Sequence, residues 1–249
     1  MAETSPPGDT LQDIVGFKYP LPNLARSLKQ RNTKIVAFGS SSTAGTRQVV
    51  PFPAYLELML RNEFGVQMTS EFGKRMINVI NRGVGGEEAS TELPRMQSDV
   101  IDEAPALVIW QVGTNAVFRN TVPEFAFEKV FAAIAEGLDR LSKLPTDVIL
   151  MDPQYTTAVV TPEKKPLSEA MVRRISELAE VAGVDVFRRY ALMEQWHIAM
   201  RELVDPADDL ALHLSDWATR NVTEVLFNQI KRMVKAAEAA ESLKFARNP

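Results

Sequence analysis

The hydrophobic residues of this chain fall into two alternating patterns. Short apolar runs rich in Val and Ile have the uninterrupted hydrophobicity of strands that are covered on both faces. These runs are "KIVAF" (34–38), "INVI" (77–80), "ALVIW" (106–110), "DVILM" (147–151) and "VDVF" (184–187). Between them, helical patterns cover 52–64, 89–102, 123–143, 167–182, 189–203 and 216–241. This alternation predicts an α/β protein in which a five-stranded parallel sheet has helices on both faces.

The ends of the chain differ from this alternating region. Residues 1–32 contain Pro and polar residues and are expected to form a leader that runs extended along the surface, whereas 242–249 are expected to be a frayed tail. No internal repeat or linker interrupts residues 33–241, which predicts a single domain. Within it, "TVPE" resembles a capping box before the 123–143 helix, and Gly65 is a candidate C-cap.

Composition excludes several classes of function. The 249 residues carry a net charge of -4, which argues against a nucleic-acid partner or an anionic membrane surface. There is no cysteine, so disulfides, thiolate nucleophiles and Cys-based metal sites are excluded. No apolar run reaches the roughly 18 residues of a membrane span. The first ten residues lack the features of a signal peptide, so we expect a cytoplasmic protein, or a periplasmic or secreted one whose signal is absent.

Ligands of such sheets bind beyond the carboxyl ends of the strands, so the residues that follow each run are informative. The first run is followed by "GSSSTAG", which can form a turn that caps a helix, bind a phosphate or present a nucleophile. Phosphate binding by a P-loop needs a Lys after Gly45, where the chain reads "GTRQ". The second run is followed by "NRGVGGEEA", whose backbone N–H groups can face an anion.

Two later segments add side chains with chemical function. "QVGTNA" after the third run contains Asn115, an amide donor that could also bond only its own turn. "LALHLS" near the C-terminus places His213 before a predicted helix, with Ser215 as its candidate N-cap. A hydroxyl, a glycine loop, an amide and an imidazole are together the parts that acyl transfer needs.

These four blocks, in this order, resemble those of the SGNH hydrolase family, the GDSL-type esterases and lipases. "FGSSSTAG" is similar to the GDSxxxG block, "NRGVGG" to the glycine block, "GTNA" to GxND and "LALHLS" to DxxH. The resemblance implies a flavodoxin-like three-layer α/β/α sandwich and hydrolysis of small acyl esters, including O-acetyl groups on carbohydrates, without a metal or cofactor. It places Ser41 as nucleophile and His213 as base. The Ser41 backbone N–H, Gly86 and Asn115 take the oxyanion positions.

The sequence departs from the family pattern at three positions. Ser40 and Ala116 stand where the family has Asp residues that are neither the nucleophile nor the base. More important, the family's acid lies three residues before the histidine, where this chain has Leu210. Asp209 is four residues before His213, and a one-residue bulge would let it reach the imidazole, so we favour Asp209. Asp208, or a Ser–His dyad without a carboxylate, stays open.

Other polar residues have simpler interpretations. Ser40 and Ser42 are expected to be turn or capping residues, and His197 to be structural within its helical pattern. Asp152, before Pro153, is accounted for by turn formation.

Trp196 and Trp217 could line an acyl or sugar pocket, although burial in the core is the preferred interpretation. The competing hypotheses for function are an acyltransferase that uses the same serine, a non-catalytic binding module on the same fold, and a nucleotide or phosphate binder.

Overall fold

The computed structural model describes residues 14–46, 48–65, 75–199 and 201–247. Five parallel strands form one sheet in the order β2-β1-β3-β4-β5. The strands are β1 (Asn32–Gly39), β2 (Met76–Gly83), β3 (Leu107–Gln111), β4 (Asp147–Met151) and β5 (Asp185–Phe187). The bounds of each strand lie within about two residues of the predicted apolar run, except that β2 continues three residues further, to Gly83. The predicted parallel sheet is therefore confirmed.

The longer helices match most of the predicted helical segments. They are α2 (Pro22–Leu28), α4 (Phe52–Phe64), α7 (Phe127–Ser142), α8 (Lys165–Ala182), α9 (Arg189–Ile198) and α10 (Asp216–Arg247). Shorter ones are α3 (Ser41–Ala44), α5 (Ala89–Glu92) and α6 (Thr114–Phe118), with short 3₁₀ or π turns at Leu93–Arg95, Gln97–Ile101, Pro123–Phe125 and Thr157–Val159. The predicted helix over 89–102 is therefore broken, because Pro94 has no N–H to continue the ladder.

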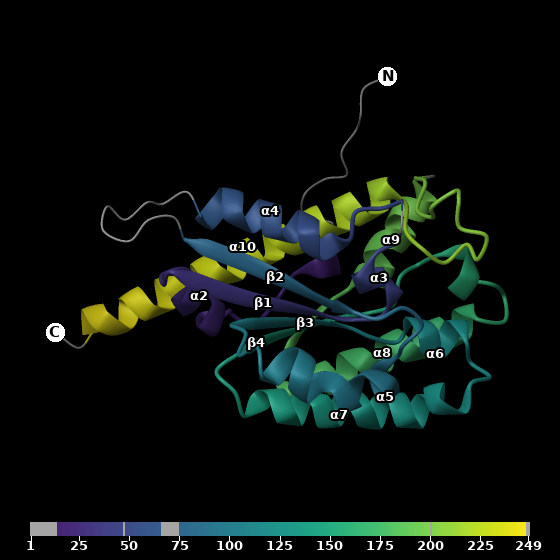
Figure 1. Ribbon diagram of the computed structural model, residues 1–249, viewed down its shortest axis with the longest axis horizontal. Coiled ribbons are helices and arrows are strands. Elements are labelled where there is room, and N and C mark those ends of the chain that lie inside the picture. The colour runs from purple at the N-terminus through teal and green to yellow at the C-terminus, as the bar shows by residue number, and fades with distance from the viewer. Residues whose placement is uncertain (1–13, 47, 66–74, 200, 248–249) are drawn as a thin grey trace, which may run out of the picture.

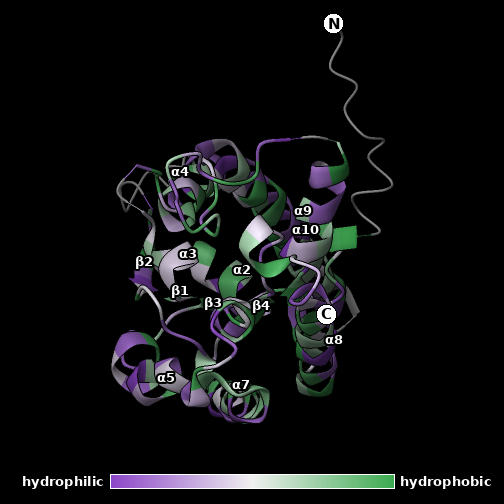
Figure 2. Cartoon of the chain, turned by 90° about the vertical axis from the view of Figure 1, so that its right-hand side faces the viewer, coloured by the Kyte–Doolittle hydropathy of each residue, from purple (hydrophilic) through white to green (hydrophobic). Residues whose placement is uncertain are grey.

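The sheet lies between two helical layers, as predicted (Figure 1). Along β1, Ile35 and Ala37 belong to one core, whereas Val36 and Phe38 belong to the other. The first core is completed by α2, α4, α9 and α10, and the second by α5, α7 and α8. Viewed along the sheet, the two layers lie above and below the strands (Figure 2). Burial on both faces explains why the strands have continuous apolar sequences.

The predicted surface leader is wrong for the residues that the structure describes. Leu21, Leu24, Ala25 and Leu28 are buried against the sheet and α10 by the helix α2. The 216–241 helix also continues through the predicted tail as far as Arg247. Residues 1–13 of the predicted leader and 248–249 of the tail lie outside the described residues.

Candidate active site

The site is built where the strands end, and the turn after β1 is its first component (Figure 1). Ser41 is the first residue of α3. The preceding Ser40 donates from both its N–H and its hydroxyl to Gln111 Oε1, over 3.0 and 2.9 Å. A Cβ on Gly83 would lie 2.1 Å from the backbone N of Ala44, so only glycine lets β2 pack this closely against α3. Ser41 is thus held on a turn that two neighbouring strands fix.

His213 approaches Ser41 from the far end of the chain. Its Nε2 lies 3.1 Å from Ser41 Oγ, within hydrogen-bond distance. The loop that carries it is braced by a bridge between Val204 and Leu214 and by bonds from Asp205 N to His213 O and from Ser215 N to Leu203 O. Ser215 Oγ accepts from Ala218 N, which confirms Ser215 as the N-cap of α10. The structure therefore brings together the two side chains that the sequence paired.

The carboxylate that meets the imidazole is Asp208, so the preference for Asp209 was wrong. Asp208 Oδ2 lies 3.1 Å from His213 Nδ1. It also accepts from the backbone N–H groups of Leu212 and His213, over 2.8 and 2.6 Å. Burial alone would raise the pKa of this carboxyl, but the two N–H groups and the imidazole outweigh it and bring the pKa below its usual value. Asp208 is ionised at neutral pH and can stabilise a protonated His213.

A turn explains why the more distant residue makes the contact. Ala211 N donates to Asp208 O, so Asp209 and Leu210 occupy the middle of a four-residue turn and are exposed. Ala211 has φ of +49°, which reverses the chain and places Leu212 and His213 over the Asp208 carboxylate. The spacing is five residues because the chain makes this complete turn between acid and base.

On the other side of Ser41, the glycine loop meets Asn115. A Cβ on Gly85 would lie 3.9 Å from Ser41 Cβ, so this loop lies beside Ser41. Gly86 has φ of +83°, a conformation that glycine adopts without strain. The buried Asn115 donates from Nδ2 to the carbonyl of Glu87, over 2.7 Å, which ties α6 to the loop. One N–H of its amide remains beyond this bond.

Beneath this loop lies a buried carboxylate that sequence analysis missed. Glu88 Oε1 accepts from Gly113 N and Ala89 N, over 2.7 and 2.9 Å, and its Oε2 accepts from Ala116 N over 3.0 Å. Burial raises the pKa of Glu88, although these amide bonds offset part of the rise. Because Glu88 binds the backbone on both sides of Asn115, it fixes the position of that amide. The predicted capping box at 121–124 was wrong, and Glu88 with Thr91 forms one instead.

A second missed residue, Gln154, connects the nucleophile turn to the histidine loop. Ser42 Oγ donates to Gln154 Oε1, and Gln154 Nε2 donates to Leu212 O over 2.7 Å. Ser42 is thus a turn residue, as expected, with its hydroxyl occupied. Gln111 and Gln154 each follow an apolar run closely, and this position at a strand end is the signal that could have found them.

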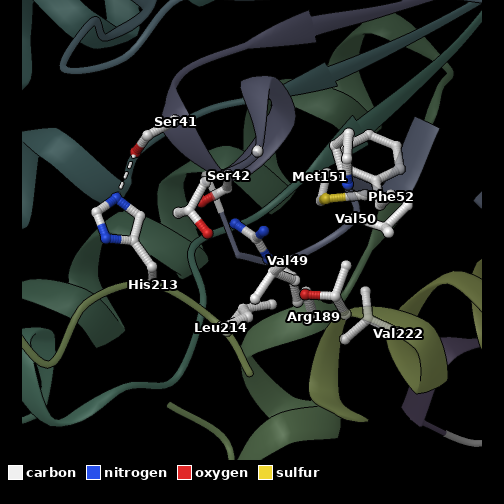
Figure 3. A pocket seen from close by; sticks show the side chains of 14 residues that line it. Ser41, Ser42, Val49, Val50, Phe52, Met151, Arg189, His213, Leu214 and Val222 are labelled. Carbon is white, nitrogen blue, oxygen red and sulfur yellow. Dashed lines mark hydrogen bonds between the residues drawn. The ribbon is translucent and has the colours of Figure 1, made fainter. Parts of the chain in front are cut away.

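A cavity of about 30 Å³ opens beside Ser41, and we call it the Arg189 cavity. Its walls are mostly apolar, with Val49, Phe52, Met151 and Val222 among them, and Ser41, His213 and Arg189 also line it (Figure 3).

The remaining candidate residues lie outside this cavity. Asp152 is fully buried and accepts from Tyr190 N, so it does not face a ligand. His197 is exposed on α9 and packs on Tyr155. Trp196 stacks on Trp217, which is exposed, contrary to the preferred interpretation.

No described helix is long and apolar enough to cross a membrane. Within the described ranges, no three His, Cys, Asp or Glu side chains converge in a way that could hold a metal ion.

A parallel sheet that presents Ser41, His213 and Asp208 in contact, with a glycine loop and an amide alongside, defines an SGNH-type hydrolase fold and site. The chain belongs to the Non-GDSL lipase-like family, which it matches over residues 8–236.

Solved structures with this fold include relatives of low sequence identity. An acetylxylan esterase from Geobacillus stearothermophilus, solved as a catalytic mutant, is similar with a TM-score of 0.64 and 20% identity, over 80% of this chain and 94% of that one. A lipase/acylhydrolase from Enterococcus faecalis is similar with a TM-score of 0.60 and 23% identity, over 80% and 95%. No curated protein matches the chain. At these identities the structural relatives establish the fold.

Proposed function

We propose that this protein is a serine esterase that hydrolyses small acyl esters, such as O-acetyl groups on carbohydrates, through an acyl-enzyme on Ser41. The observation that carries the proposal is the chain of contacts from Asp208 through His213 to Ser41, with 3.1 Å at each step. Membership of a lipase-like family and structural similarity to an acetylxylan esterase and a lipase/acylhydrolase support it.

The proton transfers follow from this geometry. Asp208 accepts a hydrogen bond from the Nδ1–H of His213, which leaves Nε2 free to take the proton of Ser41 as its Oγ attacks the ester carbonyl. The imidazolium that forms would be disfavoured at the start of α10, where the helix dipole is positive, and the ionised Asp208 offsets this cost. His213 then protonates the leaving alcohol, and water activated by the same base releases the acid.

The oxyanion of the tetrahedral intermediate needs preorganised donors. The backbone N–H groups of Ser41 and Gly86 and the remaining N–H of the Asn115 amide supply them in this proposal. Glu88 keeps the Asn115 amide in place without contacting the substrate in this proposal. Such donors act in a site largely shielded from water, where each contributes far more to the rate than it would in solution.

Labelling with a fluorophosphonate tests the proposal, with the adduct located by peptide mass spectrometry. We expect a rapid adduct on Ser41 that is absent in Ser41→Ala and strongly slowed in His213→Ala. Hydrolysis of 4-nitrophenyl acetate should fall by at least about 10³ in both variants. Ser42→Ala is the matched control, because its hydroxyl is bonded to Gln154, and it should keep the adduct. An unlabelled Ser41, under conditions that label an ordinary serine esterase, would identify the protein as a non-catalytic binding module.

A further inference from the structure

Arg189 is a buried cation beside the nucleophile that the proposed mechanism does not use. It follows β5 at the start of α9 and is 1% exposed. Its Nε and Nη2 donate to the backbone carbonyl of Asp152, over 3.1 and 2.9 Å. Among the described residues, no group accepts a hydrogen bond from Nη1. Burying a guanidinium without full pairing is costly, so its retention here calls for a further partner.

The protein itself neutralises this charge only in part. No described carboxylate lies within ion-pairing distance of Arg189. The nearby Asp152 directs one carboxylate oxygen to Tyr190 N, and its other oxygen has no hydrogen-bond partner among the described residues. Burial raises the pKa of Asp152 to about 7, so this carboxyl is a weaker counter-charge than an ordinary carboxylate. Burial lowers the pKa of Arg189 only to about 10, which leaves the guanidinium charged.

Arg189 lines the Arg189 cavity together with Ser42 and Val49 (Figure 3). No acidic residue is among the described residues that line this cavity. Besides Ser41 and Ser42, Thr46 and Thr219 line it, and Thr46 Oγ1 is buried with no hydrogen-bond partner among the residues that the structure describes. A guanidinium and hydroxyls that line one cavity without an acid are a donor set that suits a carboxylate.

The volume and the walls of the Arg189 cavity indicate which part of an ester substrate it would bind. The Arg189 cavity, at about 30 Å³, suits a short acyl chain better than a sugar ring. Its apolar walls, including Met151 and Val222, suit methylene groups between the ester carbonyl and the charge. We propose that the Arg189 cavity selects short acyl groups that end in a carboxylate, such as the succinyl group. This inference rests on the proposed function, because it assigns the acyl group of the same reaction.

Two esters of equal shape test the selectivity. The succinyl group ends in a carboxylate, and the 4-methylpentanoyl group has two methyl groups in place of the carboxylate oxygens. Both are supplied as 4-nitrophenyl esters. We expect wild-type kcat/KM to be about tenfold or more higher for the hemisuccinate, since hydrogen bonds to charged groups are the strong ones. Arg189→Met should remove or invert this preference. Arg188→Met is the matched control, because its Nη1 donates to Ser176 outside the cavity, and it should keep the ratio.

A second variant and a binding measurement cover the case in which Arg189→Met does not fold. Thr46→Val leaves the guanidinium intact and should lower the preference for the hemisuccinate several-fold. Succinate should raise the unfolding temperature of the wild type and of Ser41→Ala, whereas the neutral succinamide should not. A wild-type ratio near one, with no stabilisation by succinate, would overturn the selectivity while leaving the esterase proposal standing. Stabilisation by succinate that Thr46→Val weakens, without turnover of any ester, would instead overturn the esterase proposal and keep the anion site.

Discussion

Glu88 and Asp208 each bind backbone N–H groups of a loop that carries the site, one on each side of Ser41. Glu88 binds the amides of Gly113 and Ala116 around Asn115, whereas Asp208 binds those of Leu212 and His213. Glu88 is completely buried and touches no group that reacts in the proposed mechanism. Asp208 is partly exposed and also contacts the imidazole.

This difference separates two uses of a carboxylate. Glu88 is a positioning residue whose loss should appear mainly in stability, because three amides would lose a buried acceptor. Asp208 both shapes its loop and stabilises charge on His213, so its loss should appear first in the rate. The variants below test this division in order of expected effect.

Asp208→Asn should give the largest loss. Asn keeps an oxygen for the Leu212 and His213 amides and for His213 Nδ1, but it carries no negative charge to stabilise the imidazolium, so kcat should fall by about 10³–10⁴. The measurement is kcat for 4-nitrophenyl acetate, with circular dichroism to verify folding. Asp209→Asn is the control and should stay close to wild type, because Asp209 is exposed in the middle of its turn. A greater loss in Asp209→Asn would reverse the assignment of the acid.

Asn115→Ala should give the next largest loss, on the side of the site that Glu88 supports. Removing one oxyanion donor is expected to lower kcat by about 10²–10³ with little change in KM. Asn120→Ala, at an exposed position just beyond α6, is the matched control. Steady-state kinetics on the same ester measure both, and an unchanged rate in Asn115→Ala would remove this amide from the mechanism.

The sequence predicted the sheet well because its strands are buried on both faces and the apolar runs report that directly. It also paired Ser41 with His213, whose side chains the structure places 3.1 Å apart. It failed at α2, although Leu21, Leu24, Ala25 and Leu28 have helical spacing, because the Pro-containing leader around them looked polar. This segment was interpreted from its local sequence alone, whereas the residues that it packs against lie far away in the chain.

The acid and the supporting residues were missed for a related reason. Choosing between Asp208 and Asp209 depends on the φ of Ala211, which no residue pattern indicates. Glu88 precedes Thr91 in an order opposite to the usual Ser/Thr-x-x-Glu capping box, and most of its hydrogen-bond donors come from the loop after β3. Arg189 was unremarkable as a charged residue at a helix start until burial placed it beside the nucleophile.

Glu88→Gln should mainly lower stability. The amide NH₂ of Gln would face a backbone N–H in place of an oxygen, which should lower the free energy of unfolding by about 1–3 kcal/mol. Urea denaturation at pH 7 measures it. Glu87→Gln is the matched control: its carboxylate pairs with Arg95 near the surface, so the cost should stay below about 1 kcal/mol. Equal losses in the two variants would show that Glu88 has no special structural role.

Glu92→Gln should have the smallest effect, and one that depends on pH. Burial, and then the neighbouring Glu88 carboxylate, raise the pKa of Glu92 well above its usual value, so the fold favours the protonated form. Its Oε2 accepts from Trp110 Nε1 over 2.7 Å, a bond that Gln can keep, whereas Oε1 has no hydrogen-bond partner in the part of the chain that the structure describes. Because the pKa of Glu92 is higher in the folded than in the unfolded state, protonation of Glu92 stabilises the fold. This stabilisation is fully present below the unfolded pKa, about 4.3, and is lost as the pH rises through the folded pKa. Gln stays neutral throughout, so variant and wild type should be equally stable near pH 4, and the variant should be the more stable of the two near pH 8. Urea titrations across this range measure the difference, and a difference that does not change with pH would mean that the fold does not raise the pKa of Glu92.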